Sequence, residues 1–292
     1  MLSASYHKTV LNEWPKDYYA GMHSRSHLWK CYKSLLIRFN AHRSAMRFDH
    51  VEDSQTRAML EQVRDHGWVL LPEYRNPDWC AQAIAEFEQA LIDHAEYVRK
   101  QTDQRLFGID RASPTLRNFA EDAYLQHLSD LYHGTATKLG TCMAGRIEAD
   151  DTPKLGSGGD WHRDSSTRQL KAIIYLSDVT EQHGPFQLIE RSNDAHFKQY
   201  KQDMKQMGCH LADNRLTEAQ LDRLLQSDAS RLKSFCAPSG TVILADTSAI
   251  HRGKPIASGT RHAAFNYYYP KRQSDAWIAQ KFKPIPNVAN DH

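Results

Sequence analysis

Apolar residues recur at helical spacing in the first half of the chain. Asn76–Pro77 and Ser113–Pro114 each combine a capping residue with a proline suited to the first helical turn. Gly67 follows another periodic run, which begins at a serine cap at Ser54, and it marks where that run stops. The pattern predicts three helices, over residues 54–66, 76–98 and 113–131.

Short strand-like runs replace this pattern after Gly134. They are rich in β-branched and aromatic residues and are separated by turn residues, which is typical of antiparallel sheets. A helical insert over about 193–227, with Thr217 as a cap, interrupts them. The pattern predicts an α+β protein in which a helical layer packs on an antiparallel double sheet. The predicted strands cover residues 68–72, 137–147, 170–176, 186–189, 241–245 and 263–269.

Length and composition indicate an ordinary globular chain. It has 292 residues, of which 40% are hydrophobic and 25% charged, and a net charge of +2, so nucleic acid and anionic membranes are not expected partners. No run approaches the length of a membrane span, and the five cysteines lack metal-site spacing, so we expect a cytoplasmic protein with reduced thiols. We expect residues 1–50 to be an extension packed on a single domain over 51–292.

One stretch suggests a metal site. His162 and Asp164 are separated by one residue, and on a β-strand such residues point to the same side. His251 follows a later strand-like run and supplies a third ligand. Two histidines and one carboxylate leave three octahedral positions open, as in non-haem Fe(II) oxygenases. The other His-x-acid triplets, at His50 and His94, lie in settings without a strand pattern.

The same region resembles a known family. Residues 161–164, 173–185, 189–192 and 239–244, followed by His251 and Arg261, are similar in order and spacing to the phytanoyl-CoA dioxygenase family of Fe(II)/2-oxoglutarate oxygenases. The resemblance covers about residues 160–270. Arg163 stands where the family commonly has glutamine, and the interval from His251 to Arg261 is one residue shorter than usual.

The resemblance implies a double-stranded β-helix, or jelly roll, with its core over about 137–270. It also implies one ferrous ion, with 2-oxoglutarate and O2 as co-substrates, and a small-molecule substrate that is hydroxylated as succinate and CO2 are released. His162, Asp164 and His251 would be the catalytic metal ligands. Arg261 would bind the far carboxylate of 2-oxoglutarate, because arginine offers a planar bidentate partner. Thr260 would add a hydroxyl contact to the co-substrate.

Further arginines near the site are candidates for the substrate. Arg163 and Arg168 flank the metal site in sequence, and Arg146 lies on the preceding strand, so we expect these three to contact an anionic substrate. Arg252 follows a ligand directly and should point away. A cupin-type metal dioxygenase that does not use 2-oxoglutarate and a non-catalytic binding barrel both remain alternatives. The sequence gives no indication of oligomeric state.

Overall fold

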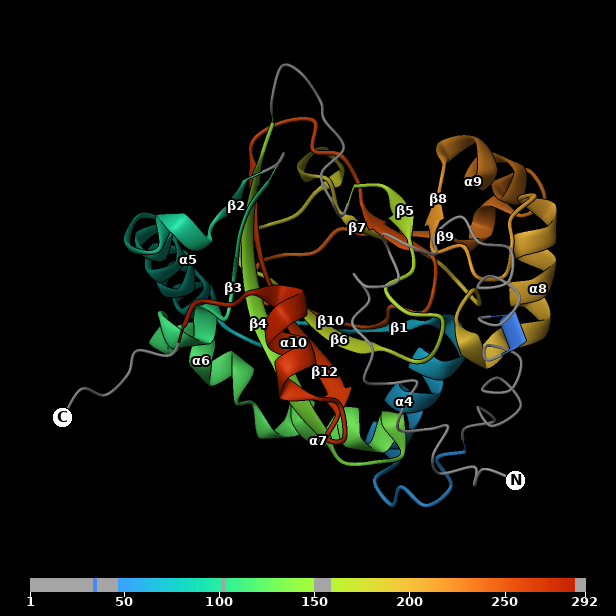
Figure 1. Ribbon diagram of the computed structural model, residues 1–292, viewed down its shortest axis with the longest axis horizontal. Coiled ribbons are helices and arrows are strands. Elements are labelled where there is room, and N and C mark those ends of the chain that lie inside the picture. Colours follow the sequence, from blue (N-terminus) through green and yellow to red (C-terminus); the bar gives the residue numbers. More distant parts are fainter. Residues whose placement is uncertain (1–33, 36–46, 101–102, 150–158, 287–292) are drawn as a thin grey trace.

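The computed structural model describes residues 34–35, 47–100, 103–149 and 159–286, and two antiparallel sheets form its centre (Figure 1). The strands are β1 Trp68–Leu71, β2 Arg99–Lys100, β3 Asp103–Phe107, β4 Thr137–Glu148, β5 Trp161–His162, β6 Leu170–Tyr175, β7 Phe186–Ile189, β8 Arg215–Leu216, β9 Leu232–Phe235, β10 Val242–Asp246, β11 His251–Gly253 and β12 Thr260–Pro270. The larger sheet has seven strands in the order β1-β10-β6-β12-β4-β3-β2. The smaller has five, in the order β8-β5-β11-β7-β9.

Helices cover the outer face of the seven-stranded sheet and the far side of the smaller one (Figure 1). The α-helices are α4 Ser54–His66, α5 Pro77–Asp93, α6 Pro114–Ala120, α7 Ala123–His133, α8 Phe197–Gln206, α9 Glu218–Leu225 and α10 Asp275–Phe282. Single 3-10 turns occur at Ala95–Tyr97, Ile109–Arg111, Glu181–His183, Asp194–His196 and Ala229–Arg231. Helices α4 to α7 pack on the large sheet, whereas α8 and α9 pack on the small one.

Side-chain alternation along the large sheet separates two interiors. On β6, Ala172 and Ile174 pack under helices α4 to α7. Their neighbours Ile173 and Tyr175 pack instead toward the small sheet, against Phe186 and residues of β10. Successive strand residues point to opposite faces, so one face of this sheet builds the main core and the other faces the space between the sheets.

The sequence predicted most elements, and the structure corrects several boundaries. Helix α4 is capped by Asp53, whose carboxylate accepts from the N–H of Thr56 at 2.7 Å, rather than by Ser54. The helix predicted over 76–98 ends at Asp93. The helix predicted over 113–131 is two helices, because the Asp122 side chain accepts the N–H groups of Tyr124 and Leu125 and starts α7.

The remaining predictions about secondary structure have different outcomes. The strands β2, β3, β8, β9 and β11 and the helix α10 were not predicted from the sequence. The insert predicted as helical over about 193–227 contains α8 and α9, with the short strand β8 between them. The expected packing of residues 1–50 lies outside the described residues, except for 34–35 and 47–50. The cap at Thr217 is confirmed, since its hydroxyl accepts from the N–H of Gln220. Among the helices described, none is long and apolar enough to cross a membrane.

Gly240 gives a direct test of how β10 is positioned. Its φ is +83°, and the carbonyl oxygen of Arg75 lies 1.8 Å from where a Cβ would be. Gly134 has a similar φ of +62° but nothing within 4 Å. We expect Gly134→Ala to lower the free energy of unfolding by about 1–2 kcal/mol through backbone strain alone. Gly240→Ala should cost a further ~1–3 kcal/mol, because the backbone of Arg75 must move.

Urea unfolding of the two variants measures this difference. Equal losses of unfolding free energy would show that the contact between Gly240 and Arg75 does not constrain the fold.

Candidate metal centre

Two short strands bring the predicted histidine ligands together. In the small sheet β11 pairs with β5, and His251 lies directly opposite His162. The centroids of the two imidazole rings are 4.3 Å apart. His162 and His251 are 8% and 4% exposed, so both rings are withdrawn from solvent. Residues about ninety positions apart in the sequence therefore form one pair of imidazoles.

Asp164 reaches the histidines by a different route from the one that the sequence suggested. Strand β5 ends at His162, so Asp164 does not share a strand face with it. Its backbone N–H donates instead to the carbonyl oxygen of Thr247 at 3.0 Å. Its carboxylate lies 3.7 Å from Nε2 of His162 and 3.3 Å from Nε2 of His251. One ligand atom from each of the three residues falls within 4.8 Å of the others.

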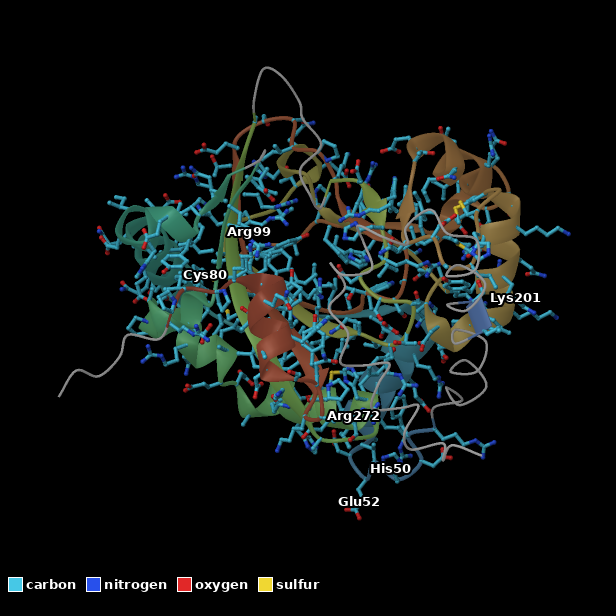
Figure 2. The ribbon with its side chains drawn as sticks, in the orientation of Figure 1. His50, Glu52, Cys80, Arg99, Lys201 and Arg272 are labelled. Atoms are coloured by element: carbon cyan, nitrogen blue, oxygen red, sulfur yellow. The ribbon has the colours of Figure 1, made fainter. Side chains whose placement is uncertain are left out.

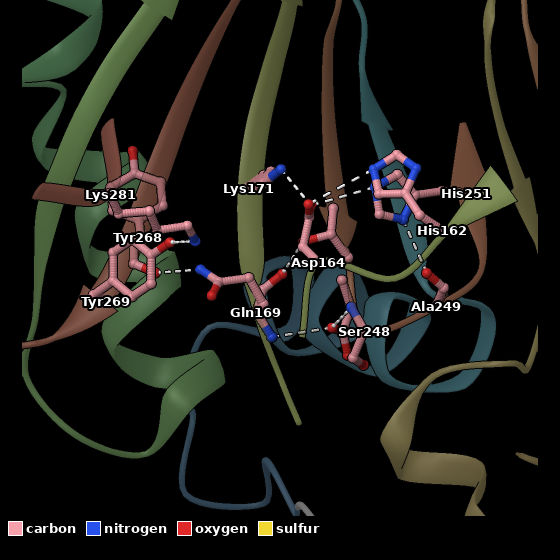
Figure 3. Close-up of polar contacts among 12 residues, drawn as sticks. His162, Asp164, Gln169, Lys171, Ser248, Ala249, His251, Tyr268, Tyr269 and Lys281 are labelled. Carbon is pink, nitrogen blue, oxygen red and sulfur yellow. Dashed lines mark hydrogen bonds and ion pairs between the residues drawn. The ribbon is translucent and has the colours of Figure 1, made fainter. Parts of the chain in front are cut away.

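A buried carboxylate fixes the turn that carries Thr247. Asp246 accepts from the Tyr132 hydroxyl at 2.7 Å and from the N–H groups of Gln169 at 3.1 Å and Ser248 at 3.0 Å. The turn before β11 is thereby connected to α7 and to the start of β6. Figure 3 shows Gln169 and Ser248 below the metal site. Asp246 thus holds the backbone that places both Asp164 and His251.

Backbone carbonyls set the orientation of both imidazoles. Nδ1 of His162 lies 2.7 Å from the carbonyl oxygen of Asp160, and Nδ1 of His251 lies 2.9 Å from that of Ala249. A carbonyl oxygen can only accept, so each Nδ1 carries a proton, and Nε2, on the side of the carboxylate, is the nitrogen that is available to a metal. Figure 3 shows both rings turned toward Asp164. This tautomer is the one in which a histidine ligates a metal through Nε2.

The charge states of these residues suit a cation. Burial, and then the neighbouring His251, lowers the pKa of His162 to about 3, so its imidazole is neutral near pH 7. Burial acts to raise the pKa of Asp164, but Lys171 and His251 outweigh it and hold that pKa well below its usual value. Two imidazoles and one carboxylate are a donor set that divalent iron accepts.

Lys171 is a site residue that sequence reasoning missed. Its ammonium forms an ion pair with Oδ2 of Asp164 (Figure 3) and lies 4.0 Å from the ring centroid of Tyr267. Lysine is almost never fully buried unless it is paired, and Lys171 is 5% exposed. The available signal was a single lysine inside the otherwise apolar strand β6, seven residues after Asp164.

Arg261 faces the same space, as the sequence predicted. It is 7% exposed on β12, and its Nη1 is buried without a hydrogen-bond partner among the described residues. Burial lowers the pKa of its guanidinium, while the nearby Tyr175 acts to raise it. A buried guanidinium nitrogen with no partner carries a desolvation cost that an anionic ligand would remove. Thr260 precedes it on β12 and lies outside the cavity lining, so the contact expected of its hydroxyl is not supported.

Three arginines expected to contact the substrate lie outside the cavity and make structural contacts instead. Arg146 pairs with Glu88 of α5, and Arg168 donates to the carbonyl oxygen of Tyr132 at 3.2 Å. Arg163 donates to the carbonyl oxygens of Ser192 and Ser248, with its guanidinium 4.1 Å from the ring centroid of Tyr200. Between the two ligands it thus fixes the loop rather than the substrate.

Arg252 points away from the metal-site residues, as expected. Its guanidinium lies 4.3 Å from the ring centroid of Trp161 and forms an ion pair with Glu218 on α9. Its Nε donates to the side chain of Gln187 at 2.8 Å. Of the two arginines that follow the distal histidine, Arg261 is therefore the one that faces the site.

All of the inward-facing groups line one cavity of about 380 Å³ between the sheets. Its walls include His162, Asp164, Lys171, His251 and Arg261. Apolar and aromatic side chains supply most of the remaining lining, among them Phe107, Met143, Ile147, Ile173, Phe186, Phe265, Tyr267 and Phe282. A concave apolar pocket with a few convergent polar groups is the usual form of a small-molecule site.

Replacing Lys171 tests the ion pair beside the site. Lys171→Met leaves the partly buried carboxylate of Asp164, whose side chain is 24% exposed, without its cation. We expect the metal-free protein to lose about 2–4 kcal/mol of unfolding free energy, somewhat less than for a fully buried ion pair. Lys254→Met is a matched control, because Lys254 lines the same cavity but pairs with the exposed Glu181. It should cost about 0–1 kcal/mol.

Urea unfolding with and without a divalent metal measures both effects. A bound metal ion stabilises every variant that keeps the site, and at Asp164 it also supplies the counter-charge that Lys171→Met lacks. Added Mn(II) should therefore narrow the difference in unfolding free energy between Lys171→Met and the wild type, and leave the difference for Lys254→Met unchanged. Equal, small losses in both variants would contradict this account of Lys171.

Comparison with known proteins gives structural matches only. No family model and no curated protein matches the sequence. HygX from Streptomyces hygroscopicus, with nickel and 2-oxoglutarate bound, is 18% identical with a TM-score of 0.53, over 74% of this chain and 87% of its own. The epimerase SnoN, in complex with Fe3+, alpha ketoglutarate and nogalamycin RO, is 13% identical with a TM-score of 0.57, over 82% and 93%. EctD from S. alaskensis, with 2-oxoglutarate and 5-hydroxyectoine, is 18% identical with a TM-score of 0.55, over 78% and 79%. At these identities, the chain shares the fold of the three proteins.

Proposed function

We propose that the protein is a non-haem Fe(II)/2-oxoglutarate-dependent dioxygenase that hydroxylates a small organic molecule. The observation that carries this proposal is the convergence of His162, Asp164 and His251 with the buried guanidinium of Arg261 on one cavity. Either feature alone is compatible with other functions. A three-residue N,N,O metal site beside a buried guanidinium, whose Nη1 has no hydrogen-bond partner in the described part of the chain, matches what iron and a chelating dicarboxylate require together.

The residues present fit both groups. His162 and His251 turn their Nε2 atoms toward Asp164, whose carboxyl is ionised, so these three residues would hold a divalent cation from one side and leave other positions for further ligands. Nη1 of Arg261 has no partner among the described residues and would bind the far carboxylate of 2-oxoglutarate. Solved structures with this fold include proteins with 2-oxoglutarate bound, which further supports the proposal.

In this proposal the chain orients the reactants and excludes water. Bound iron, 2-oxoglutarate and O2 would together supply the oxidising chemistry that replaces a substrate C–H hydrogen with hydroxyl, with release of succinate and CO2. The carbonyls of Asp160 and Ala249 hold the ligand imidazoles in place. The ring centroid of Phe186 is 5.5 Å from that of His251, so an apolar ring packs beside this histidine. A buried site of this kind keeps bulk water away from the reacting carbon.

We further propose that the two sheets form the double-stranded β-helix of the phytanoyl-CoA dioxygenase group, with its core over about 137–270 in a single domain over 51–292. The resemblance of residues 161–164 and 173–185 to that group supports this assignment. The antiparallel pairing of β6 with β10 and β12, and of β11 with β5 and β7, also supports it, because a jelly roll is built from two antiparallel sheets.

Anaerobic titration with Fe(II) and then 2-oxoglutarate tests the proposed function. The wild type should develop the visible charge-transfer band of an iron–2-oxoglutarate chelate, and His162→Ala should not. Arg261→Gln should weaken 2-oxoglutarate binding by about 10- to 100-fold, because it removes a charge-assisted bidentate contact. Arg252→Gln is the matched control, since its guanidinium points to Trp161 and Glu218.

The other outcomes separate the alternatives. Iron binding without a band, and without an effect of Arg261→Gln, would favour a metal dioxygenase that does not use 2-oxoglutarate. No iron binding at all would leave a non-catalytic binding barrel. Once a substrate is found, a product whose mass contains no added oxygen atom would show that the enzyme catalyses an oxidation other than hydroxylation.

A further inference from the structure

The lining of the cavity has more cationic than anionic side chains, and this excess is larger than the proposed metal and co-substrate require. Its lining has seven lysine and arginine side chains against three carboxylates, namely Arg99, Arg105, Lys171, Arg215, Lys254, Arg261 and Lys281 against Asp103, Glu148 and Asp164. The whole chain has a net charge of only +2. A divalent iron and a dianionic 2-oxoglutarate would cancel each other's charge. Loading the site with iron and 2-oxoglutarate would therefore leave the excess of cationic side chains in the lining unchanged.

Several of these cations have their charge balanced by neighbours. Lys171 pairs with Asp164, and Lys254 pairs with Glu181, which lies outside the lining. Arg105 pairs with Asp103 on the same strand. Arg261 would be taken by 2-oxoglutarate in the proposed function. Arg99 differs from these, because no ion pair joins it to a carboxylate within the described ranges.

Arg99 is held in place at the rim of the cavity. Its guanidinium lies 4.3 Å from the ring centroid of Phe107 and donates to the carbonyl oxygens of Phe282 and, at 3.4 Å, of Lys281. Figure 2 shows it close to the end of α10 that carries these carbonyls. The side chain is exposed, so an incoming ligand can reach it. Stacking and two carbonyl contacts fix the cation before any ligand binds, which lowers the entropy cost of binding.

A second arginine lies directly beside it. β2 pairs with β3 so that Arg99 is opposite Arg105, and both side chains line the cavity. Like charges directly opposite on neighbouring strands destabilise a sheet. Burial, followed by the charge of Arg105, lowers the pKa of Arg99. This repulsion is relieved when an anion binds between the two guanidinium groups.

An apolar surface adjoins the two arginines. The ring centroids of Phe107 and Phe282 are 5.3 Å apart, those of Tyr267 and Phe282 are 5.1 Å apart, and all three side chains line the cavity. Tyr267 also contacts Lys171, the partner of the metal-site carboxylate. The aromatic group therefore extends from the arginines at the rim toward the metal site.

We propose that the substrate carries a carboxylate or phosphate group, which Arg99 binds with support from Arg105 while an apolar part of the substrate packs on Phe107, Tyr267 and Phe282. This inference rests on the proposed function and names the substrate class of that same cavity. The anionic group anchors the substrate at the rim, so the carbon to be oxidised lies on the apolar part that faces the metal site.

Matched probes test the proposal with the full chain loaded with Fe(II) and 2-oxoglutarate under anaerobic conditions. The probes are 3-phenylpropionate, phenyl phosphate and the neutral 3-phenylpropionamide, with affinity measured by calorimetry. We expect the anionic probes to bind at least about tenfold more tightly than the amide, as one charge-assisted contact predicts. The charge-transfer band, followed in the same samples, reports whether 2-oxoglutarate stays bound.

Variants locate the contact. Arg99→Gln should abolish the preference for the anionic probes while leaving the band unchanged, and Arg99→Lys should keep part of the preference because it keeps the charge. Arg272→Gln, at an exposed arginine outside the cavity lining, should behave like the wild type. Thermal unfolding of each variant shows whether loss of the contact between residue 99 and α10 destabilises the protein. A variant that unfolds at the wild-type temperature but lacks the preference has lost anion binding selectively.

Two results would overturn the inference. One is equal or undetectable binding of the acid and the amide by an enzyme that shows the band. The other is a preference for anions that survives in a folded Arg99→Gln variant. Absence of the band in the wild type would instead count against the proposed function itself, so the two failures are distinguishable.

Discussion

The pairing of two short strands is the constraint on which the candidate site depends. β5 and β11 are only two and three residues long, yet their register sets His162 opposite His251. A shift by one residue would turn one imidazole to the other face of the sheet, because side chains alternate along a strand. The register is fixed from both sides, since β11 also pairs with β7 and the turn before it is held by Asp246.

Several charged side chains that are wholly or partly buried lie near the two paired histidines. Asp164, Lys171 and Arg261 are all withdrawn from solvent to different degrees, and each would be costly without a partner. The structure pairs Asp164 with Lys171 but leaves Nη1 of Arg261 without a partner among the described residues. The two buried cations therefore differ: Lys171 is used in an ion pair, whereas Arg261 keeps a nitrogen that could bind an anionic ligand.

The seven-stranded sheet stabilises the candidate site because its two faces have different surroundings: one packs in the main core and the other lines the cavity. On β12, Ala264 and Tyr268 pack into the core beneath helices α4 to α7, whereas Arg261 and Phe265 face the cavity. The helical layer supplies the apolar burial that the cavity side, with its many charged groups, does not. The charged side chains of the candidate site can therefore lie on one face of the sheet, because the other face packs in an apolar core.

The sequence by itself indicated the three metal-site residues, most helices and about half of the strands, because ligand type, spacing and apolar periodicity are local properties of the chain. The role expected of Arg261 came from the family resemblance. The sequence placed Arg146 and Arg168 at the substrate and overlooked Lys171 and Arg99, because proximity along the chain does not decide which face of a sheet a side chain occupies. The tertiary structure decided those positions through strand register and through the partners that each buried charge requires. Register and charge pairing join distant segments, so they exist only once the sheets have formed.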